Sequence, residues 1–445
     1  MNGKKSRRRF LAAMAAAAAA GVSGCGSNGS STPTAADVDE TPTAEPSPEP
    51  EPTPTPGSTP TPSPMDGSTP TAESTPESTP EETSTATATA TPEAAELSDW
   101  PVFMYNDQNW GHHPEATGPH GEVSVVWERD LESNQVNGSP VLANGQLYVG
   151  DGRRNTDSGT LYVLDPMTGE TNWTVDFPGP VMSGACVADN DLVYAGARGT
   201  VVAHRQDGGE VYRWNSQSDG LVTSPTFADG SLFFGLEDSL YRYRARAKAQ
   251  EWVTETFGRI PSAPVYADGT VYIPSFDSTV YAYNADSGNE MWTVDLGGRV
   301  NGLSMRNERL YAASENNRLV QLNTQGNQVW EIGTGAAATA TPAVTEDSVY
   351  VGTRDGALLS RSLDDGFEQW RFTDPSGEIT APPVVADGTV YFGCNDNNVY
   401  AISADNGELE WSFETGNNIV NPAPVVSGGM VFIGSRDGKF YALSD

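Results

Sequence analysis

The sequence predicts an all-β fold, an eight-bladed β-propeller with four-stranded blades that follows a disordered stalk. One observation is a series of eight tryptophans with spacings of 46, 41, 38, 40, 38, 40 and 41 residues, which is the period of a four-stranded blade. Each repeat also alternates Val, Tyr and Phe between Asp-Gly or Asn-Gly turns, as β-hairpins do. No segment shows a sustained helical period, which excludes α/β enzyme folds. The series consists of Trp127, Trp173, Trp214, Trp252, Trp292, Trp330, Trp370 and Trp411.

Residues 1–25 are expected to form an export signal. A basic stretch that contains Arg7 and Arg8 precedes an apolar, Ala-rich run that is too short to span a bilayer. The paired arginines ahead of Phe-Leu resemble the twin-arginine export signal. The Val-Ser-Gly-Cys sequence that ends at Cys25 resembles a lipobox, with Cys25 as the lipidated first residue of the mature protein. We therefore expect a lipid-anchored protein on the outer face of the cytoplasmic membrane.

Residues 26–98 are expected to be a disordered linker rich in Thr, Pro and Glu. This stretch contains no Lys or Arg, fifteen prolines and thirteen acidic residues. Such a composition buries too little apolar surface to offset the entropy of the chain, so it stays extended. Its repeated Thr-Pro pairs resemble O-glycosylated stalks. The linker is predicted to hold a folded domain away from the membrane.

The charge balance excludes some partners. The chain has 59 acidic and 25 basic residues, a formal net charge of −34. So negative a surface repels nucleic acid and anionic lipid headgroups, and we expect neither to bind the folded domain. We interpret the acidity as adaptation to high salt, since the composition resembles that of haloarchaeal proteins; a specific cation-binding role is the alternative. Three cysteines are too few for a disulfide scaffold, and no Cys/His spacing indicates a metal cage.

The strands expected at the two ends of the propeller sequence predict how the ring closes. Residues 99–121 form a connecting segment, and the propeller itself is predicted for residues 122–445. A strand at 122–131 carries Trp127 and precedes the first complete set of inner strands, whereas residues 424–445 supply three strands and no tryptophan strand. The N-terminal strand should therefore complete the last blade, which removes open sheet edges. We expect a monomer.

The repeats also resemble a known family. Residues 165–173 match the D-x-x-T-G-x-x-x-W motif of the quinoprotein (PQQ-repeat) eight-bladed propellers, and residues 284–292 are a near match. The third unit departs from the motif, with Lys248 at the glycine position. Residues 100–103 resemble the segment that leads into exported members. The resemblance implies that the eight tryptophans dock one blade against the next and are structural. The glycine four residues before tryptophan recurs at Gly326, Gly366 and Gly407.

The resemblance implies either of two kinds of protein. Dehydrogenases of this family hold pyrroloquinoline quinone (PQQ) and Ca²⁺ in the central funnel, often beside a disulfide between adjacent cysteines, whereas the BamB-like lipoproteins keep the propeller without a cofactor. Here Cys186 and Cys394 fall in different blades, and the long insertions that build a quinone pocket are missing. We therefore expect a protein-interaction or ligand-binding scaffold with no cofactor and no catalytic residue. A PQQ- or metal-dependent dehydrogenase using funnel carboxylates such as Glu378 is one alternative, and a cell-surface glycan-binding adhesin, suggested by the stalk, is another.

Ligand-binding residues are expected in the loops that enter each inner strand and in those that join the second and third strands. Arg259 and Arg299 are conspicuous because basic residues are scarce, and two neighbouring guanidinium groups suit a carboxylate or sulfate. Ion pairing with acidic surroundings is the alternative for both. The loop at 151–157 is longer than its counterparts and is placed to overhang the pore. The candidate ligand-binding residues are Gln135, Arg259, Arg299, Glu378 and Asn418.

Three of the four histidines, His112, His113 and His120, fall within nine residues. Such a cluster is compatible with Zn²⁺ or Cu²⁺ binding, because neutral imidazole is a common metal ligand. No cysteine and few acids lie nearby. We therefore expect a solvated loop here and assign no metal site.

Overall fold

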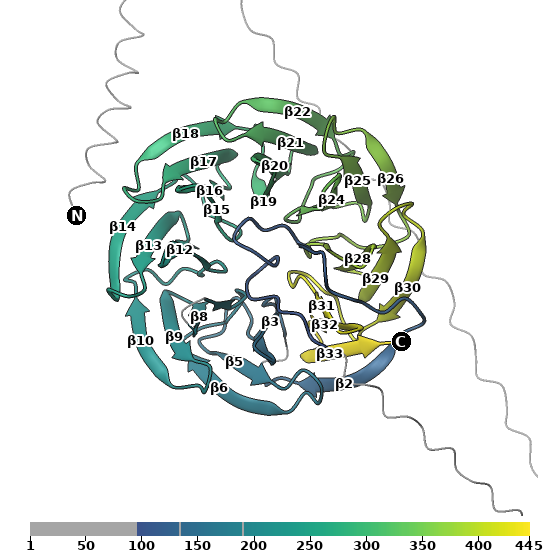
Figure 1. The fold of residues 1–445 in the computed structure, drawn as a ribbon, viewed down its shortest axis with the longest axis horizontal. Coiled ribbons are helices and arrows are strands. Elements are labelled where there is room, and N and C mark those ends of the chain that lie inside the picture. Colours follow the sequence, from purple (N-terminus) through teal and green to yellow (C-terminus); the bar gives the residue numbers. More distant parts are fainter. Residues whose placement is uncertain (1–95, 133–134, 189–190) are drawn as a thin grey trace, which may run out of the picture. The chain divides into compact units, whose positions relative to one another are not determined.

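The computed structural model describes residues 96–132, 135–188 and 191–445, which form a ring of eight antiparallel sheets (Figure 1). Each sheet has four strands, except for one that gains a fifth strand from the connecting segment. The predicted eight-bladed propeller is confirmed. The expected export signal with Arg7, Arg8 and Cys25, and the expected linker up to residue 95, lie outside the described residues. The part of the chain that the structure describes has no helix long and apolar enough to cross a membrane.

The strands of each blade are ordered from the channel outwards, and blade 1 begins with β3. The innermost strands are β3 (Val141–Ala143), β7 (Cys186–Val187), β11 (Thr226–Ala228), β15 (Val265–Ala267), β19 (Val300–Arg306), β23 (Ala343–Val344), β27 (Val384–Ala386) and β31 (Val425–Ser427). The second strands are β4 (Gln146–Gly150), β8 (Leu192–Ala197), β12 (Ser231–Leu236), β16 (Thr270–Pro274), β20 (Arg309–Ser314), β24 (Ser348–Gly352), β28 (Thr389–Gly393) and β32 (Met430–Gly434).

The third strands are largely buried like the second, whereas the fourth strands at the rim consist mostly of exposed and half-buried residues. The third strands are β5 (Gly159–Leu164), β9 (Thr200–Arg205), β13 (Ser239–Arg244), β17 (Thr279–Asn284), β21 (Arg318–Asn323), β25 (Leu358–Ser362), β29 (Asn398–Ser403) and β33 (Lys439–Ser444). The fourth strands are β6 (Thr171–Phe177), β10 (Glu210–Asn215), β14 (Ala249–Glu255), β18 (Glu290–Asp295), β22 (Gln328–Gly333), β26 (Glu368–Phe372), β30 (Leu409–Glu414) and β2 (Ser124–Asp130).

The ring closes through the strand that carries Trp127, as predicted. Strand β2 pairs in antiparallel register with β33, so that Trp127 lies opposite Ala442 and Ser124 lies opposite Ser444. Blade 8 therefore combines the last three strands of the chain with the first long one. As a result, each of the eight blades has its fourth strand.

Most of the tryptophans link one blade to the next. The indole Nε1 of Trp127 donates to the carbonyl oxygen of Pro166 in the β5–β6 turn at 2.9 Å, and five further indoles make the equivalent bond. Gly169 in this turn has φ +68°, and a Cβ there would lie 2.5 Å from the Trp127 ring. Lys248 replaces the glycine in blade 3, and within the described residues Trp214 makes no such indole bond. The turn thus requires glycine both for its conformation and for its contact.

The connecting segment crosses the ring on one face (Figure 1). Its backbone is hydrogen-bonded to the innermost strand, or the turn after it, in seven of the eight blades. Trp100 at its start is 1% exposed and donates from Nε1 to the carbonyl oxygen of Val426 at 2.7 Å. The backbone partners are Trp100 and Leu142, Pro101 and Val187, Asp107 and Tyr266, Gln108 and Met305, Trp110 and Val344, Gly111 and Val385, and Thr117 and Gly429.

The expectation of a solvated loop around the histidines is wrong for two of them. His112 and His113 form strand β1 (His112–His113), which pairs in parallel with β27 inside the ring. His113 is buried and His112 is half-buried. The inner edge of β27 would otherwise present unpaired backbone groups to the channel, and β1 satisfies them. Only His120 is exposed.

Candidate functional site: a funnel at the end of the channel

A cavity of about 350 Å³ opens at the centre of the propeller. Most residues that line it precede the innermost strands or lie in the loops between second and third strands. The connecting segment instead contacts the opposite ends of those strands, next to turns such as the one at Gly429. Phe103 of the connecting segment also lines the cavity and forms its floor. The channel is therefore a funnel that is open on one face, termed the funnel face here, and closed on the other by the connecting segment.

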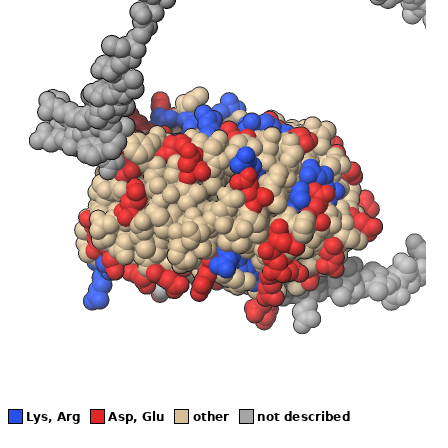
Figure 2. Space-filling view, turned by 90° about the horizontal axis from the view of Figure 1, so that it is seen from above, with Lys and Arg blue, Asp and Glu red and all other residues tan. Residues whose placement is uncertain are grey.

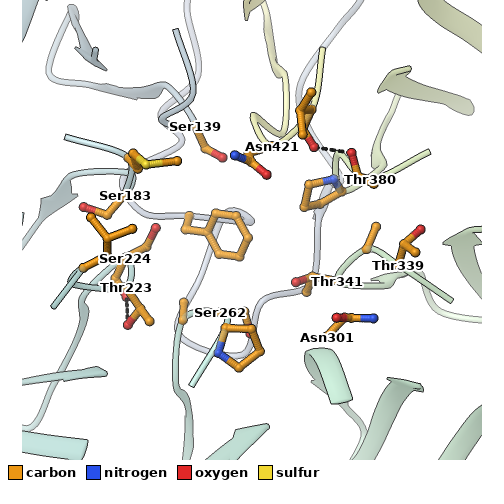
Figure 3. Close-up of a pocket in the computed structure, with 18 of the residues that line it drawn as sticks. Ser139, Ser183, Thr223, Ser224, Ser262, Asn301, Thr339, Thr341, Thr380 and Asn421 are labelled. Carbon is orange, nitrogen blue, oxygen red and sulfur yellow. Dashed lines mark hydrogen bonds between the residues drawn. The ribbon is translucent and has the colours of Figure 1, made fainter. Parts of the chain in front are cut away.

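The wall of the funnel is rich in hydroxyl and amide side chains, which Figure 3 shows around a common opening. Several of them join neighbouring blades, because the loops converge as they enter the innermost strands. Thr339 donates to the carbonyl oxygen of Ile379 at 2.7 Å, and Asn301 donates to that of Ala338 at 2.8 Å. The Oγ of Ser262 is buried without a hydrogen-bond partner among the described residues. The labelled residues are Ser139, Ser183, Thr223, Ser224, Ser262, Asn301, Thr339, Thr341, Thr380 and Asn421.

One side of the funnel rim carries compensated charges. The guanidinium of Arg354 lies 3.2 Å from a carboxylate oxygen of Glu315 and 3.8 Å from one of Glu378. All three residues line the cavity and come from blades 5, 6 and 7. Because these groups are partly exposed, their ion pairs are screened by solvent and mainly fix the position of Arg354.

The other side of the rim carries positive charge without close ion pairs. The guanidinium carbons of Arg259 and Arg299 lie 5.6 Å and 5.3 Å from the centre of the Phe276 ring. Throughout the described residues, neither side chain has a carboxylate oxygen within the 4.0 Å of an ion pair. Burial, and then the nearby guanidinium of Arg154, lower the pKa of Arg259, and the carboxylate of Glu237 opposes this shift from beyond ion-pair distance.

Arg154 reaches the funnel from the long loop of blade 1, which follows β4. Arg198 in blade 2 holds this loop, because its guanidinium donates to Asp157 at 3.3 Å and to the carbonyl oxygen of Arg154 at 3.1 Å. The side chain of Arg154 lines the cavity. The loop therefore reaches the funnel, and its arginine adds to the positive charge on this side of the rim.

The sequence-based candidates separate into two groups. Arg259 and Glu378 line the cavity, whereas Gln135, Arg299 and Asn418 do not. Gln135 accepts a hydrogen bond from Asn137 at 3.3 Å, and the carbonyl of Asn418 accepts one from the backbone of Arg436.

Sequence reasoning missed the floor and the hydroxyl wall of the funnel. A repeated signal for the wall was present, because a hydroxyl residue stands directly before proline at the start of three inner strands. These are the runs Gly-Ser-Pro at 138–140, Thr-Ser-Pro at 223–225 and Ala-Thr-Pro at 340–342.

The side chains of the three clustered histidines lie in three different environments. The Nδ1 of His112 lies 3.3 Å from the guanidinium of Arg306, and burial followed by that charge lowers the pKa of His112 to about 4. The ring of His113 packs against Tyr105, with centroids 4.4 Å apart. His120 lies 2.9 Å from a carboxylate oxygen of Asp387. Across the ranges that the structure describes, no three His, Cys, Asp or Glu side chains are grouped to hold a metal.

The funnel residues do not fit a Ca²⁺-bound quinone. Calcium takes six to eight oxygen ligands, usually including several carboxylates. Glu315 and Glu378 are the carboxylates that line the funnel, and Arg354 is close to both. Cys186 and Cys394 are buried in blades 2 and 7 and are not joined by a disulfide. Burial raises the pKa of Cys394 to about 12, so its thiol is unreactive at neutral pH.

Comparison with known proteins gives a consistent result. Among curated proteins, the chain is 24% identical to the outer membrane protein assembly factor BamB of Yersinia pestis over 283 residues, which are 57% of this chain and 70% of that protein. It is 25% identical to BamB of Salmonella typhimurium over 272 residues, 54% of this chain and 65% of that protein.

Solved structures share the fold. BamB from Moraxella catarrhalis superposes with a TM-score of 0.60 at 17% identity, covering 73% of this chain and 98% of that one. Quinohemoprotein alcohol dehydrogenase from Comamonas testosteroni gives 0.66 at 14% identity, covering 78% and 80%. The family described as outer membrane protein assembly factor BamB matches residues 121–220, 197–304 and 276–445. This chain therefore belongs to the BamB family.

Proposed function

We propose that this protein is a membrane-anchored, extracytoplasmic scaffold that binds a protein partner on its funnel face and catalyses no reaction. Membership of a family named for protein assembly supports a protein partner. The anchor at Cys25, the export signal at Arg7 and Arg8, and the position on the outer face of the cytoplasmic membrane are part of the proposal. A quinohemoprotein alcohol dehydrogenase shares the fold, but a PQQ- or metal-dependent dehydrogenase is disfavoured by the missing Ca²⁺ ligand set in the described funnel.

One observation carries the proposal, an aromatic and cationic patch on the funnel face. Phe257 is 76% exposed and lies two residues before Arg259. Its backbone N–H donates to Asp277 at 2.9 Å, which fixes it beside Phe276 and the two arginines on that ring. Aromatic and Arg side chains supply most of the binding energy in protein interfaces. An exposed phenylalanine flanked by arginines is therefore a suitable anchor for a partner.

The experiment compares two variants of the full-length protein in its own cells. F257S combined with R299Q removes the exposed ring and one rim charge, whereas R246Q removes an exposed charge from the β13–β14 turn on the opposite face. After cross-linking and purification from membranes, mass spectrometry should identify a protein that is retained by wild type and R246Q and lost from F257S/R299Q. If all three retain the same proteins, the funnel face is not the binding surface.

A further inference from the structure

The protein keeps a cationic site without close ion pairs although its acidic residues outnumber its basic ones by more than two to one. In the side view, many of the Lys and Arg side chains gather along the upper edge of the propeller, whereas acidic side chains form patches along the lower edge and at the right (Figure 2). In such a chain a buried or half-buried arginine normally finds a carboxylate, as Arg242 does with Asp286 at 3.0 Å. Within the described funnel, the half-buried Arg259 has no carboxylate oxygen within 4.0 Å, and neither has Arg154, which is exposed.

Both arginines are held in place by contacts other than ion pairs. Arg198 fixes the backbone of Arg154 at 3.1 Å, and the ring of Phe276 supports the guanidinium of Arg259. The guanidinium of Arg259 and the backbone of Arg154 are therefore positioned before any ligand arrives. Two like charges that face one cavity repel each other, and Arg259 has also lost water through partial burial. An anion placed between them would offset both costs.

We propose that Arg154 and Arg259 bind a carboxylate group of an acidic segment of the partner protein, inserted into the funnel. The inference rests on the proposed function, which makes the partner a protein. The cavity of about 350 Å³ admits a few side chains and not a folded domain, so the inserted element is an extended segment or a chain end. Arg299 stands on the rim beside Phe276 and adds to the attraction on approach.

The rest of the funnel is suited to an extended peptide. Hydroxyl and amide side chains can form hydrogen bonds with peptide groups, and Ser262, three residues after Arg259, has an unpartnered hydroxyl. Glu315 and Glu378 on the far side would repel a carboxylate. The acidic side chain of the segment is thus directed towards blades 1 and 4.

The test uses a defined probe, an acetylated hexaglutamate peptide carrying a fluorophore, and the full-length protein. Anisotropy is recorded at the lowest salt at which circular dichroism shows the propeller intact. We expect saturable binding that weakens as salt is added. R154Q combined with R259Q should weaken binding by at least about tenfold, since each charge-assisted hydrogen bond contributes roughly that much. R246Q, the same charge change on the other face, should bind as wild type does.

Competitors distinguish the sources of the carboxylate. Unlabelled hexaglutamate should displace the probe at lower concentrations than free glutamate, and hexaglutamine should not displace it. Displacement by hexaglutamine, or equal binding by wild type and R154Q/R259Q, would overturn the proposal. So would stronger displacement by oligogalacturonate, which would make the ligand an acidic glycan.

The two proposals fail separately. If hexaglutamate does not bind, but a partner is still retained in a Phe257-dependent manner, carboxylate recognition is wrong and the scaffold stands. If the peptide binds and R154Q/R259Q abolishes this, while no protein is retained through the funnel face, the scaffold is wrong and the anion site is real.

Discussion

The indole Nε1 of Trp411 donates to the carbonyl oxygen of Pro119 at 3.0 Å, where six other tryptophans bind the turn of the next blade. The exception follows from ring closure. Blade 8 has no turn between its third and fourth strands, because these strands come from opposite ends of the propeller sequence. The connecting segment supplies the missing acceptor, so one segment contributes both to closing the ring and to closing the channel.

Trp100 should therefore be important for stability. Replacement by alanine removes a side chain that is 1% exposed and its hydrogen bond to Val426. We expect the free energy of unfolding to fall by about 3–5 kcal/mol, the usual cost of emptying a large aromatic site. Urea denaturation followed by circular dichroism measures it. F257A at an exposed site should change the same quantity by less than about 0.5 kcal/mol; equal effects would contradict the structural role of Trp100.

Glycine is favoured at position 169 for two reasons, its positive φ and its close contact with the Trp127 ring, and their energetic costs can be measured separately. Gly169 and Gly145 have nearly the same φ, +68° and +70°, but a Cβ at Gly169 meets the Trp127 ring whereas one at Gly145 meets nothing within 4 Å. G145A should cost about 1–2 kcal/mol from backbone strain alone. G169A should cost clearly more in the same urea titration. A G169A variant no less stable than G145A would show that the indole moves aside freely.

His112 should make the protein sensitive to mild acid. Its pKa in the fold is about 4, below the ordinary 6.5, so the unfolded chain takes up the proton first as the pH falls. The folded state therefore loses stability between about pH 6.5 and 4, and the loss levels off below that range. H112Q should flatten this part of the profile of unfolding free energy against pH.

His120 provides a control of opposite sign for that experiment. Its hydrogen bond to Asp387 raises its pKa, so its contribution to stability is present below the ordinary pKa and is lost as the pH rises through the folded value. H120Q should thus weaken the protein at low pH, where H112Q strengthens it relative to wild type. Parallel profiles for the two variants would refute the assignment.

Arg198 should act on ligand binding without touching the ligand. R198Q removes the contacts to Asp157 and to the backbone of Arg154, so the long loop of blade 1 loses its support. We expect hexaglutamate binding to weaken several-fold, because a mobile Arg154 loses entropy on binding. The urea midpoint should hardly change. R213Q, which breaks an exposed pair with Glu210 in the same blade, should leave binding intact.

The architecture was predictable because it is local and repeated. The positions of Trp127 and Trp411, with a missing fourth strand at the C-terminal end, were enough to predict eight blades and their closure. The course of the connecting segment was not predictable. It has no strand pattern of its own, and its hydrogen bonds go to residues up to several hundred positions away, which only the finished ring brings together.

The funnel was predictable in part for a similar reason. Arg259 and Glu378 were correctly predicted to line the funnel because each lies in a loop a few residues before an innermost strand. Whether an arginine at the rim forms an ion pair with a carboxylate depends on the direction in which its side chain points, and this direction cannot be predicted from the sequence. The support of Arg259 by Phe276 and the hold of Arg198 on the loop of Arg154 are contacts between different loops or blades.

The path of the connecting segment also determines how the propeller meets mechanical force. A pull along the chain from residue 96 reaches Trp100 and the backbone bonds to the inner strands before it reaches β2. Those bonds are spread over seven blades, so they must break one after another before the pull can peel the closing strand from β33. A tether attached at this end would therefore strain the channel floor first and leave the opposite, ligand-facing rim undisturbed.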